Sequence, residues 1–291
     1  MKHTLRFIFR AIGTFLLLVI LYIVGSLILG TYYDYQPESV LKIESAHSSN
    51  QKLITDSTLT FMTWNIGFGG LGKESDFFMT TEGIYWSSEK NVTTDEQYVE
   101  KNVSGITDFI KKNEADFYLL QEVDVHSKRS YFKNEFEMIA EQKDGFAAMF
   151  APNYDIPRNP IPVFQPWNTY GKVLSGLATY SKYQPVESTR LQLPGEFPWP
   201  DRVFHLDRCV SVHRFPTDFG KEVVVLNIHN SAFDKGGFMK TQQLDFLRDL
   251  ALKEYEKGNY VLLGGDWNMC CLLYTSPSPR DATLSRMPSS A

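Results

Sequence analysis

The sequence predicts a layered α/β or α+β domain that follows a single N-terminal transmembrane helix. Short apolar segments rich in strand formers alternate with amphipathic helical segments along most of the chain, as in layered domains. The chain has 291 residues, of which 43% are hydrophobic and 22% charged, so it suits one large domain with a sizeable core. An uninterrupted apolar run near the N-terminus predicts the transmembrane helix.

The transmembrane helix is predicted over residues 11–30. This run contains no charged residue, and about 20 apolar residues are enough to cross the hydrocarbon core of a bilayer. Basic residues precede it at Lys2, Arg6 and Arg10, so residues 1–10 are predicted to be a cytoplasmic basic stub. We therefore expect a single-pass protein of the cell membrane, anchored through residues 11–30, whose remaining chain is extracytoplasmic.

A cleaved signal peptide is the alternative interpretation of the same run. The apolar part of a signal peptide is usually about 7–15 residues long and ends at a small-residue site. Here the run is longer and no A-x-A pattern follows it. Tyr32, Tyr33 and Tyr35 stand where membrane helices place interfacial aromatic residues, and residues 31–56 are predicted to be a polar linker.

The globular domain is predicted over residues 57–269. Strands are expected at 58–66, 115–121, 146–153, 174–181, 186–193, 203–214, 222–229 and 260–263. One helix is expected from Thr93 or Thr94 as N-cap to Asn113, with Val99, Val103, Ile106 and Ile110 inside, and another at 130–142. A third is expected after Gly236 and Gly237, to about residue 257, with Leu244, Leu247 and Ala251 inside. Prolines at 157, 160, 162 and 166 predict a loop over residues 155–170.

The charge and the cysteines argue against an avid nucleic-acid-binding protein and against a disulfide-rich protein. A net charge of -5 and a pI of about 5.7 do not favour avid sequence-independent binding to nucleic acid, although a local basic groove would still permit a nuclease. Cys209 stands apart from the adjacent Cys270 and Cys271, so no disulfide framework is indicated. We interpret Cys209 as a small buried residue.

The C-terminal residues 270–291 differ in character from the chain before them. They are rich in Ser, Pro and Arg and show no apolar period. A disordered tail is one interpretation. The string also resembles a translated sequencing-adapter read-through, and we therefore predict that residues 270–291 are non-native and that the domain is truncated near Met269.

Polar residues follow the ends of separate apolar strands. They are Asn65, Glu122, Asn227, His229, Asp266 and Asn268. Strand ends that meet at one edge of a sheet commonly build a site. Carboxylate and amide oxygens suit a hard divalent cation, and histidine suits a phosphoryl group. Taken singly, each of these residues also fits a turn, a solvated carboxylate or a buried histidine, so the prediction depends on their occurring together.

Four short motifs resemble those of the endonuclease/exonuclease/phosphatase family, which includes deoxyribonuclease I. They are Trp64-Asn65-Ile66, Leu120-Gln121-Glu122-Val123, Asn227-Ile228-His229 and Gly265-Asp266-Trp267-Asn268. The segment Gly171 to Lys182 is similar to a central strand of that family, in which Ser175 and Gly176 are expected to serve packing. The resemblance implies two packed mixed β-sheets flanked by helices.

The resemblance also implies the chemistry of the site. Glu122 would be the principal ligand of Mg²⁺ or Mn²⁺, with Asn65 near the metal. Asp266 would align or activate the attacking water. Asn268 and His229 would bind the phosphate and stabilise its developing charge, and Asn227 is placed with them as a phosphate-binding residue. The implied function is a metal-dependent phosphate-ester hydrolase, a phosphodiesterase or nuclease.

One motif of that family is missing. It closes with a strand that carries Asp-His, and residues 269–291 contain no histidine. We therefore expect the native protein to be an enzyme and this 291-residue chain to be nearly inactive. The alternative is a membrane-tethered binding module that has kept the fold and lost catalysis.

The substrate is left open between a nucleic acid and a phospholipid head group. Aromatic segments at 164–170 and 197–200 could contact lipid or bases, or simply pack as loops. Phosphate oxygens could also be gripped by Arg202, Arg208, Lys235 and Lys240, unless these are ordinary solvated side chains. No obligate protein partner is indicated.

Overall fold

The computed structural model describes residues 2–75, 93–232, 234 and 236–269. The predicted foreign tail, residues 270–291, and Lys235 lie outside the described residues. Within the described residues, Cys209 is buried and forms no disulfide, as the sequence predicts.

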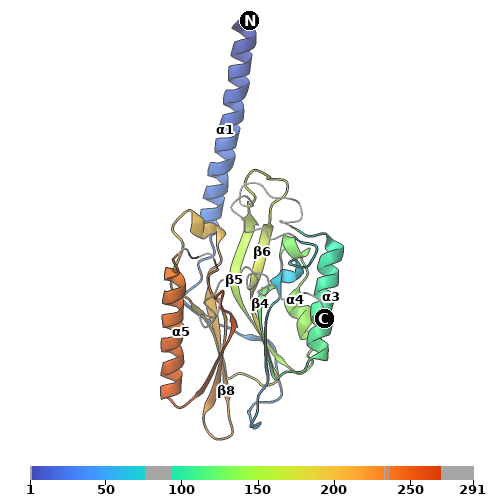
Figure 1. Ribbon diagram of the computed structural model, residues 1–291, viewed down its shortest axis with the longest axis vertical. Helices are drawn as coiled ribbons and strands as arrows, with labels where there is room; N and C mark the ends of the chain where they lie inside the picture. Colours follow the sequence, from blue (N-terminus) through green and yellow to red (C-terminus); the bar gives the residue numbers. More distant parts are fainter. Residues whose placement is uncertain (1, 76–92, 233, 235, 270–291) are drawn as a thin grey trace, which may run out of the picture.

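The N-terminal helix α1 (Lys2–Tyr32) stands out from the domain as a single rod (Figure 1). It starts before the predicted run of residues 11–30 and ends two residues beyond it. Its side chains are mostly exposed apolar groups. Among the described residues it is the one helix long and apolar enough to cross a membrane.

The first β-sheet, sheet A, has five strands in the order β1-β7-β8-β9-β10. These are β1 (Val40–Lys42), β7 (Glu187–Gln192), β8 (Cys209–Pro216), β9 (Glu222–His229) and β10 (Tyr260–Asp266). Neighbouring strands are antiparallel except β9 and β10, which are parallel, so the sheet is mixed.

The second sheet, sheet B, has the order β2-β5-β6-β4-β3. Its strands are β2 (Ser45–His47), β5 (Ala147–Asn159), β6 (Gly171–Ser181), β4 (Phe117–Asp124) and β3 (Phe61–Asn65). Only β3 and β4 run parallel, so this sheet is mixed as well.

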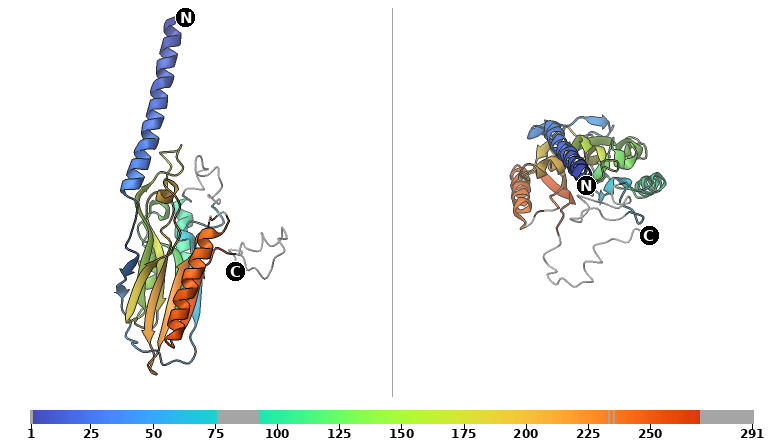
Figure 2. Two further views of the ribbon diagram at one scale, coloured as in Figure 1. Left: turned by 90° about the vertical axis from the view of Figure 1, so that its left-hand side faces the viewer. Right: turned by 90° about the horizontal axis from the view of Figure 1, so that it is seen from above.

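The two sheets pack face to face between two outer helical layers (Figures 1 and 2). The main core lies between the sheets and includes Phe117, Leu177 and Phe215. Helix α5 (Phe238–Glu256) covers sheet A through Leu247. Helices α3 (Glu96–Lys112) and α4 (Glu135–Ala140) cover sheet B. The predicted fold class, two packed mixed sheets flanked by helices and preceded by one apolar helix, is confirmed.

Several predicted boundaries differ from the structure. Strands β1 and β2 lie within residues 31–56, because short polar segments extend the edges of both sheets instead of forming a linker. Strand β5 continues to Asn159, into the predicted loop 155–170, because β6 supplies an antiparallel partner as far as Gly171.

The helices also differ from their predicted ends. The predicted helix 130–142 is reduced to α4, preceded by the 3₁₀ turn η2 (Lys128–Ser130). The Thr94 hydroxyl does not cap α3 but donates to the carbonyl of Gly70, and Asp95 occupies the N-cap position. The predicted inner face of α3, including Val99 and Ile110, is buried.

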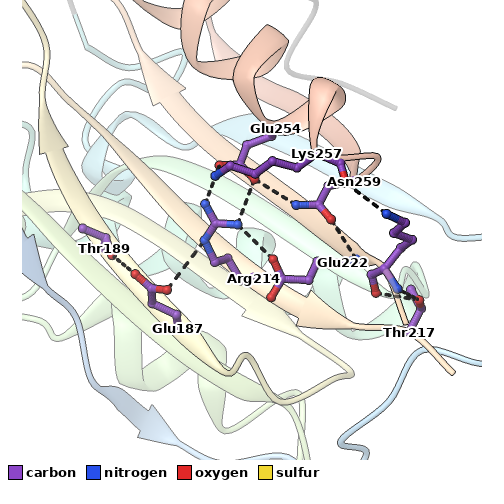
Figure 3. Close-up of polar contacts among 9 residues, drawn as sticks. Glu187, Thr189, Arg214, Thr217, Glu222, Glu254, Lys257 and Asn259 are labelled. Carbon is purple, nitrogen blue, oxygen red and sulfur yellow. Dashed lines mark hydrogen bonds and ion pairs between the residues drawn. The ribbon is translucent and has the colours of Figure 1, made fainter. Parts of the chain in front are cut away.

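A cluster of charges fastens α5 to sheet A (Figure 3). The guanidinium of Arg214 on β8 donates to both carboxylate oxygens of Glu254 on α5, at 2.9 and 2.6 Å, and to Glu222 on β9 at 2.9 Å. Lys257 and Asn259 also donate to Glu254. The hydrogen bond from Arg214 lowers the pKa of Glu254 to about 2. This buried carboxylate therefore holds the helix against two strands.

Candidate active site

The candidate active site lies where β3, β4, β9 and β10 end. Parallel neighbours end at the same edge of a sheet, so β3 ends beside β4 and β9 ends beside β10. A hydrogen bond from Asn65 at the end of β3 to Asp266 at the end of β10 joins the two pairs across the sheets. Polar side chains from four distant segments thus meet at one edge.

Asn65 is at the centre of this group. Its amide nitrogen donates to Oε1 of Glu122 at 3.0 Å and to Oδ2 of Asp266 at 2.8 Å. Its amide oxygen accepts from the backbone N–H of Gly67 at 3.0 Å, which fixes the orientation of the side chain. One amide therefore holds two carboxylates close together.

Glu122 is aimed by a bulge in β4. The pairing with β6 shifts register between Leu120 and Val123, and Glu122 has a φ of 55°, in the left-handed region. A bulge re-aims a side chain, and a non-glycine residue in this region is strained, a feature common at functional sites. The predicted strand 115–121 thus continues past Glu122 to Asp124 instead of ending before it.

His229 lies at the end of β9, buried beneath the two carboxylates. Its Nε2 is 3.6 Å from Oδ2 of Asp266 and 3.8 Å from Oε1 of Glu122. Burial, assisted by the nearby positive charge of Arg208, lowers the pKa of His229 well below its ordinary value. The imidazole is therefore neutral near pH 7, and its Nδ1 has no hydrogen-bond partner among the described residues.

The Gly265-Asp266-Trp267-Asn268 segment comprises the last two residues of β10 and the two residues after it, where the chain turns back on the Asp266 side chain. Gly265 has a φ of 142°, and a Cβ there would lie 2.0 Å from the carbonyl oxygen of Ile228, so only glycine fits. Oδ1 of Asp266 accepts from the backbone N–H of Asn268. The Asn268 amide donates to the carbonyl of Asn230, which ties the turn to the end of β9.

Asn227 does not take part in the site, contrary to the phosphate-binding role predicted for it. It is fully buried, and its amide nitrogen donates to the carbonyl of Ala178 at 3.0 Å and also towards Leu120 and Thr179. Its amide oxygen accepts from Gln121 at 2.8 Å. Asn227 lies two residues inside the edge, so sheet B covers it and it joins the two sheets.

Arg208 belongs near the site, although the sequence offered only its charge as a signal. It directly precedes β8, whose first residues pair with the end of β9. Its guanidinium is close enough to Glu122 and Asp266 for both carboxylates to oppose the effect of burial, which lowers its pKa. Its Nη1 is buried without a hydrogen-bond partner in the described part of the chain. Lys240 lies nearby and donates to the backbone oxygen of Asn268.

The donor set at this edge fits a hard divalent cation. Glu122 and Asp266 offer carboxylate oxygens that are partly exposed, at 22% and 26%. In residues 2–75, 93–232, 234 and 236–269, no three His, Cys, Asp or Glu side chains form a complete metal-binding cluster. Mg²⁺ is usually held by one or two carboxylates, with water and substrate phosphate completing its shell, so this arrangement suits it.

A sequence profile of the Endonuclease/Exonuclease/phosphatase family matches residues 62–288, more than half of the chain. The chain belongs to this family. Its members are phosphoric ester hydrolases and generally use divalent metals. The match includes all four motifs and continues past residue 269, so the C-terminal boundary of the domain stays a prediction.

Solved structures similar to this family member share little sequence with it. The 2′,3′-cyclic phosphatase ANGEL2 is 16% identical over 80% of this chain and 57% of its own, with a TM-score of 0.49. An endonuclease/exonuclease/phosphatase from Beutenbergia cavernae DSM 12333 is 20% identical over 76% and 49%, with a TM-score of 0.49. The chain thus spans about half the length of these structures. No curated protein matches it significantly.

Proposed function

We propose that the protein is a metal-dependent hydrolase of phosphate esters, a phosphodiesterase or nuclease, in which water attacks phosphorus in line. The observation that carries the proposal is the convergence of Asn65, Glu122, His229 and Asp266 from four strand ends within hydrogen-bond or near-contact distance. Family membership supports the reaction class.

The residues divide the chemistry between them. Glu122 would hold Mg²⁺ or Mn²⁺, with Asn65 beside it, and the bound cation would neutralise charge on the phosphate oxygens. Asp266 is fixed by Asn65 and by the Asn268 backbone, so its carboxylate is oriented to align the attacking water or to accept its proton. Asn65 thereby keeps both carboxylates in position.

The phosphate would be bound by hydrogen-bond donors and by a positive charge. A neutral His229 can donate one hydrogen bond to a phosphoryl oxygen and needs no charge to do so. Asn268 stands next to Asp266 in the same turn, and Arg208 adds a fixed positive charge behind the site. These donors would stabilise the negative charge that develops in the transition state.

Metal binding and turnover test this proposal separately. Mn²⁺ binding, followed by electron paramagnetic resonance, should weaken by at least about tenfold in Glu122→Gln. The matched control is Glu141→Gln, which removes an exposed carboxylate at the C-terminal end of α4 and should bind Mn²⁺ normally. Equal binding by all three proteins would refute the metal site.

Turnover is measured on bis(p-nitrophenyl) phosphate with Mg²⁺. His229→Ala and Asp266→Asn should each reduce the rate by roughly a hundredfold or more. The missing Asp-His motif predicts weak turnover by the 291-residue chain. A second chain is therefore assayed beside it, in which residues 1–268 continue with the sequence that the genomic DNA encodes after codon 268. An in-frame Ser-Asp-His with turnover supports the enzyme. Mn²⁺ binding without turnover in both chains favours the binding module.

We also propose that the domain is extracytoplasmic and anchored by residues 11–30, and that its substrate is a nucleic acid or a phospholipid head group. The exposed apolar surface of α1 and the basic residues before its apolar run support the anchor.

A further inference from the structure

We propose that the catalytic edge of the domain faces the bilayer and that the substrate is the phosphodiester of a zwitterionic phospholipid in the leaflet next to the domain. This inference rests on the proposed hydrolase function and on α1 as the anchor. Of the two substrate classes proposed above, the geometry selects the phospholipid head group over the nucleic acid.

The first observation is that the end of α1 is fastened to the domain. The Trp199 indole N–H donates to the hydroxyl of Thr31 in the last turn of α1 at 3.0 Å. Arg202 pairs with Asp34 at 3.3 Å. Gly30 lies against the 3₁₀ turn η3 (Asp201–Phe204), where an added Cβ would be in ordinary contact with Val203 at 3.5 Å. A hydrogen bond, an ion pair and a packing contact therefore join the end of α1 to η3 and to Trp199 shortly before it.

The second observation is that η3 and the site lie at the same edge. The chain runs from η3 through Arg208 into β8, and β8 pairs antiparallel with β9, so Val210 lies opposite Ile228. The start of β8 is therefore beside the end of β9, where His229 stands. In Figures 1 and 2 α1 rises from this end of the domain, and the turn between β8 and β9 lies at the opposite end.

A pocket lies between the end of α1 and Arg208. Its lining includes Asp34 and Arg202 at the anchor, and Arg208 and Ser231 next to the catalytic residues. Nη1 of Arg208 is buried and has no partner in the described part of the chain, so it is free to donate a hydrogen bond to a phosphate oxygen. A head group bound there would lie beside the arginine whose charge interacts with Glu122 and Asp266.

Side chains at this edge suit a lipid surface. If residues 11–30 cross the hydrocarbon, Thr31 lies at the interface, and its hydrogen bond holds Trp199, which is 56% exposed, at the same depth. Tyr32 is 78% exposed in the same turn of α1, and Phe238, at the start of α5, is 70% exposed. Tryptophan and tyrosine are the residues that membrane interfaces prefer.

The charges on the pocket favour a lipid over a nucleic acid. The pocket is lined by Glu196, by Asp34 in its pair with Arg202, and by Asp207, whose pKa is raised to about 7 by burial. Above pH 7 these carboxylates would repel successive phosphates of a nucleic acid, and the net charge of -5 adds to this repulsion. A zwitterionic head group brings one phosphate for Arg208 and one ammonium for the carboxylates. In the reaction, oxygen of water bonds to phosphorus, one ester P–O bond breaks, and the leaving oxygen takes a proton as an alcohol.

Tryptophan quenching tests the geometry without turnover. The full 291-residue chain is reconstituted into phosphatidylcholine vesicles with brominated acyl chains near the interface. We expect Trp199→Phe to lose part of the bromolipid-quenched emission. The matched reporter is Phe219→Trp in the β8–β9 turn, at the opposite end and 60% exposed, whose added emission should be quenched by acrylamide alone. Unchanged bromolipid quenching in Trp199→Phe would overturn the inference.

Substrate choice is then measured in phosphatidylcholine vesicles with Mg²⁺. The protein is the chain whose residues after position 268 are those that the genomic DNA encodes. We expect release of the water-soluble head-group product, with no cleavage of linear DNA added outside. Trp199→Ser should lower lipid cleavage several-fold relative to bis(p-nitrophenyl) phosphate, and Phe219→Ser should not. Cleavage of DNA but not lipid overturns the inference and leaves the hydrolase intact. Cleavage of no ester at all overturns the hydrolase, and this inference with it.

Discussion

At the scale of single residues, two asparagines three positions apart show how hydrogen bonding decides whether a buried amide stabilises the fold. Asn227 and Asn230 are both fully buried. Asn227 makes hydrogen bonds through both amide atoms to sheet B, whereas neither amide atom of Asn230 has a partner among the described residues. Buried polar groups cost stability unless they are hydrogen-bonded, so these two residues contribute with opposite sign.

Replacing these asparagines should therefore have unequal effects. We expect Asn227→Ala to lower the free energy of unfolding by about 2–3 kcal/mol, because Gln121 and the carbonyl of Ala178 lose their partner. Asn230→Ala should cost less than about 1 kcal/mol, because it removes an unpaired amide. Urea denaturation of both variants measures the difference, and equal destabilisation would contradict it.

Glu135 gives a second prediction at this scale. Burial, together with the neighbouring Asp124, raises the pKa of Glu135 well above 4.5. In the unfolded chain this carboxyl ionises near its ordinary pKa, whereas in the folded chain it stays protonated to higher pH. Its contribution to the free energy of unfolding is therefore fully present below about pH 4.5 and is lost as pH rises above that value. Glu135→Gln removes this loss and still accepts from the Asp124 N–H through its amide oxygen.

The measurement is urea unfolding at pH 5 and pH 8. Relative to wild type, Glu135→Gln should be more stable at pH 8 than at pH 5. An exposed control, Glu141→Gln, should show no such change with pH. A constant difference between wild type and Glu135→Gln at the two pH values would be evidence against the buried acid.

At the scale of elements, strand ends and helix attachments decide where chemistry can occur. The bulge in β4 turns Glu122 towards Asn65, and the turn after β10 holds Asp266 opposite. Helix α5 spans the chain between β9 and β10, and Arg214 fixes it to sheet A through Glu254. The position of β10, which carries Asp266, therefore depends on a charge cluster at the opposite end of α5.

Glu254→Gln should weaken this attachment. We expect a loss of roughly 2 kcal/mol at pH 7, because Arg214 loses its bidentate carboxylate partner and keeps only Glu222 at hydrogen-bond distance. The depressed pKa of Glu254 means that its contribution is present above about pH 4.5 and is lost as pH falls towards about 2. The variant should therefore lack part of the acid dependence of wild-type unfolding.

The matched control for Glu254 is Glu256→Gln, which lies two residues further along α5 and is exposed. Its free energy of unfolding should equal that of wild type within about 0.5 kcal/mol, both at pH 7 and below about pH 4.5. If Glu254→Gln behaves like this control, the cluster in Figure 3 does not hold the helix.

At the scale of the whole molecule, helix α1 and the candidate active site lie at the same end of the domain. With α1 as the proposed anchor, the proposed phosphoesterase would meet lipid phosphates at the surface of its own membrane, whereas a soluble polyanion would have to enter between the domain and the bilayer. The topology of the chain decides which leaflet and which compartment supply the substrate.

Topology can be tested with a reporter. Alkaline phosphatase fused after residue 56 should be active in intact cells, because it folds only outside the cytoplasm, and the basic stub keeps the N-terminus inside. Replacing Lys2, Arg6 and Arg10 by Glu should reduce this activity several-fold. An inactive wild-type fusion would place the domain in the cytoplasm.

The sequence by itself determined the apolar N-terminal helix, most strand positions and the polar residues at strand ends, because burial and periodicity are written in local composition. It also indicated the family. Only the tertiary structure decided that Asn227 lies inside and His229 at the edge, since that depends on how far sheet B reaches along β9. It likewise recruited β1 and β2 as sheet edges, brought Arg208 to the candidate site and placed that site at the same end of the domain as α1. Contacts between distant segments decide these features, and such contacts have no signature in either segment alone.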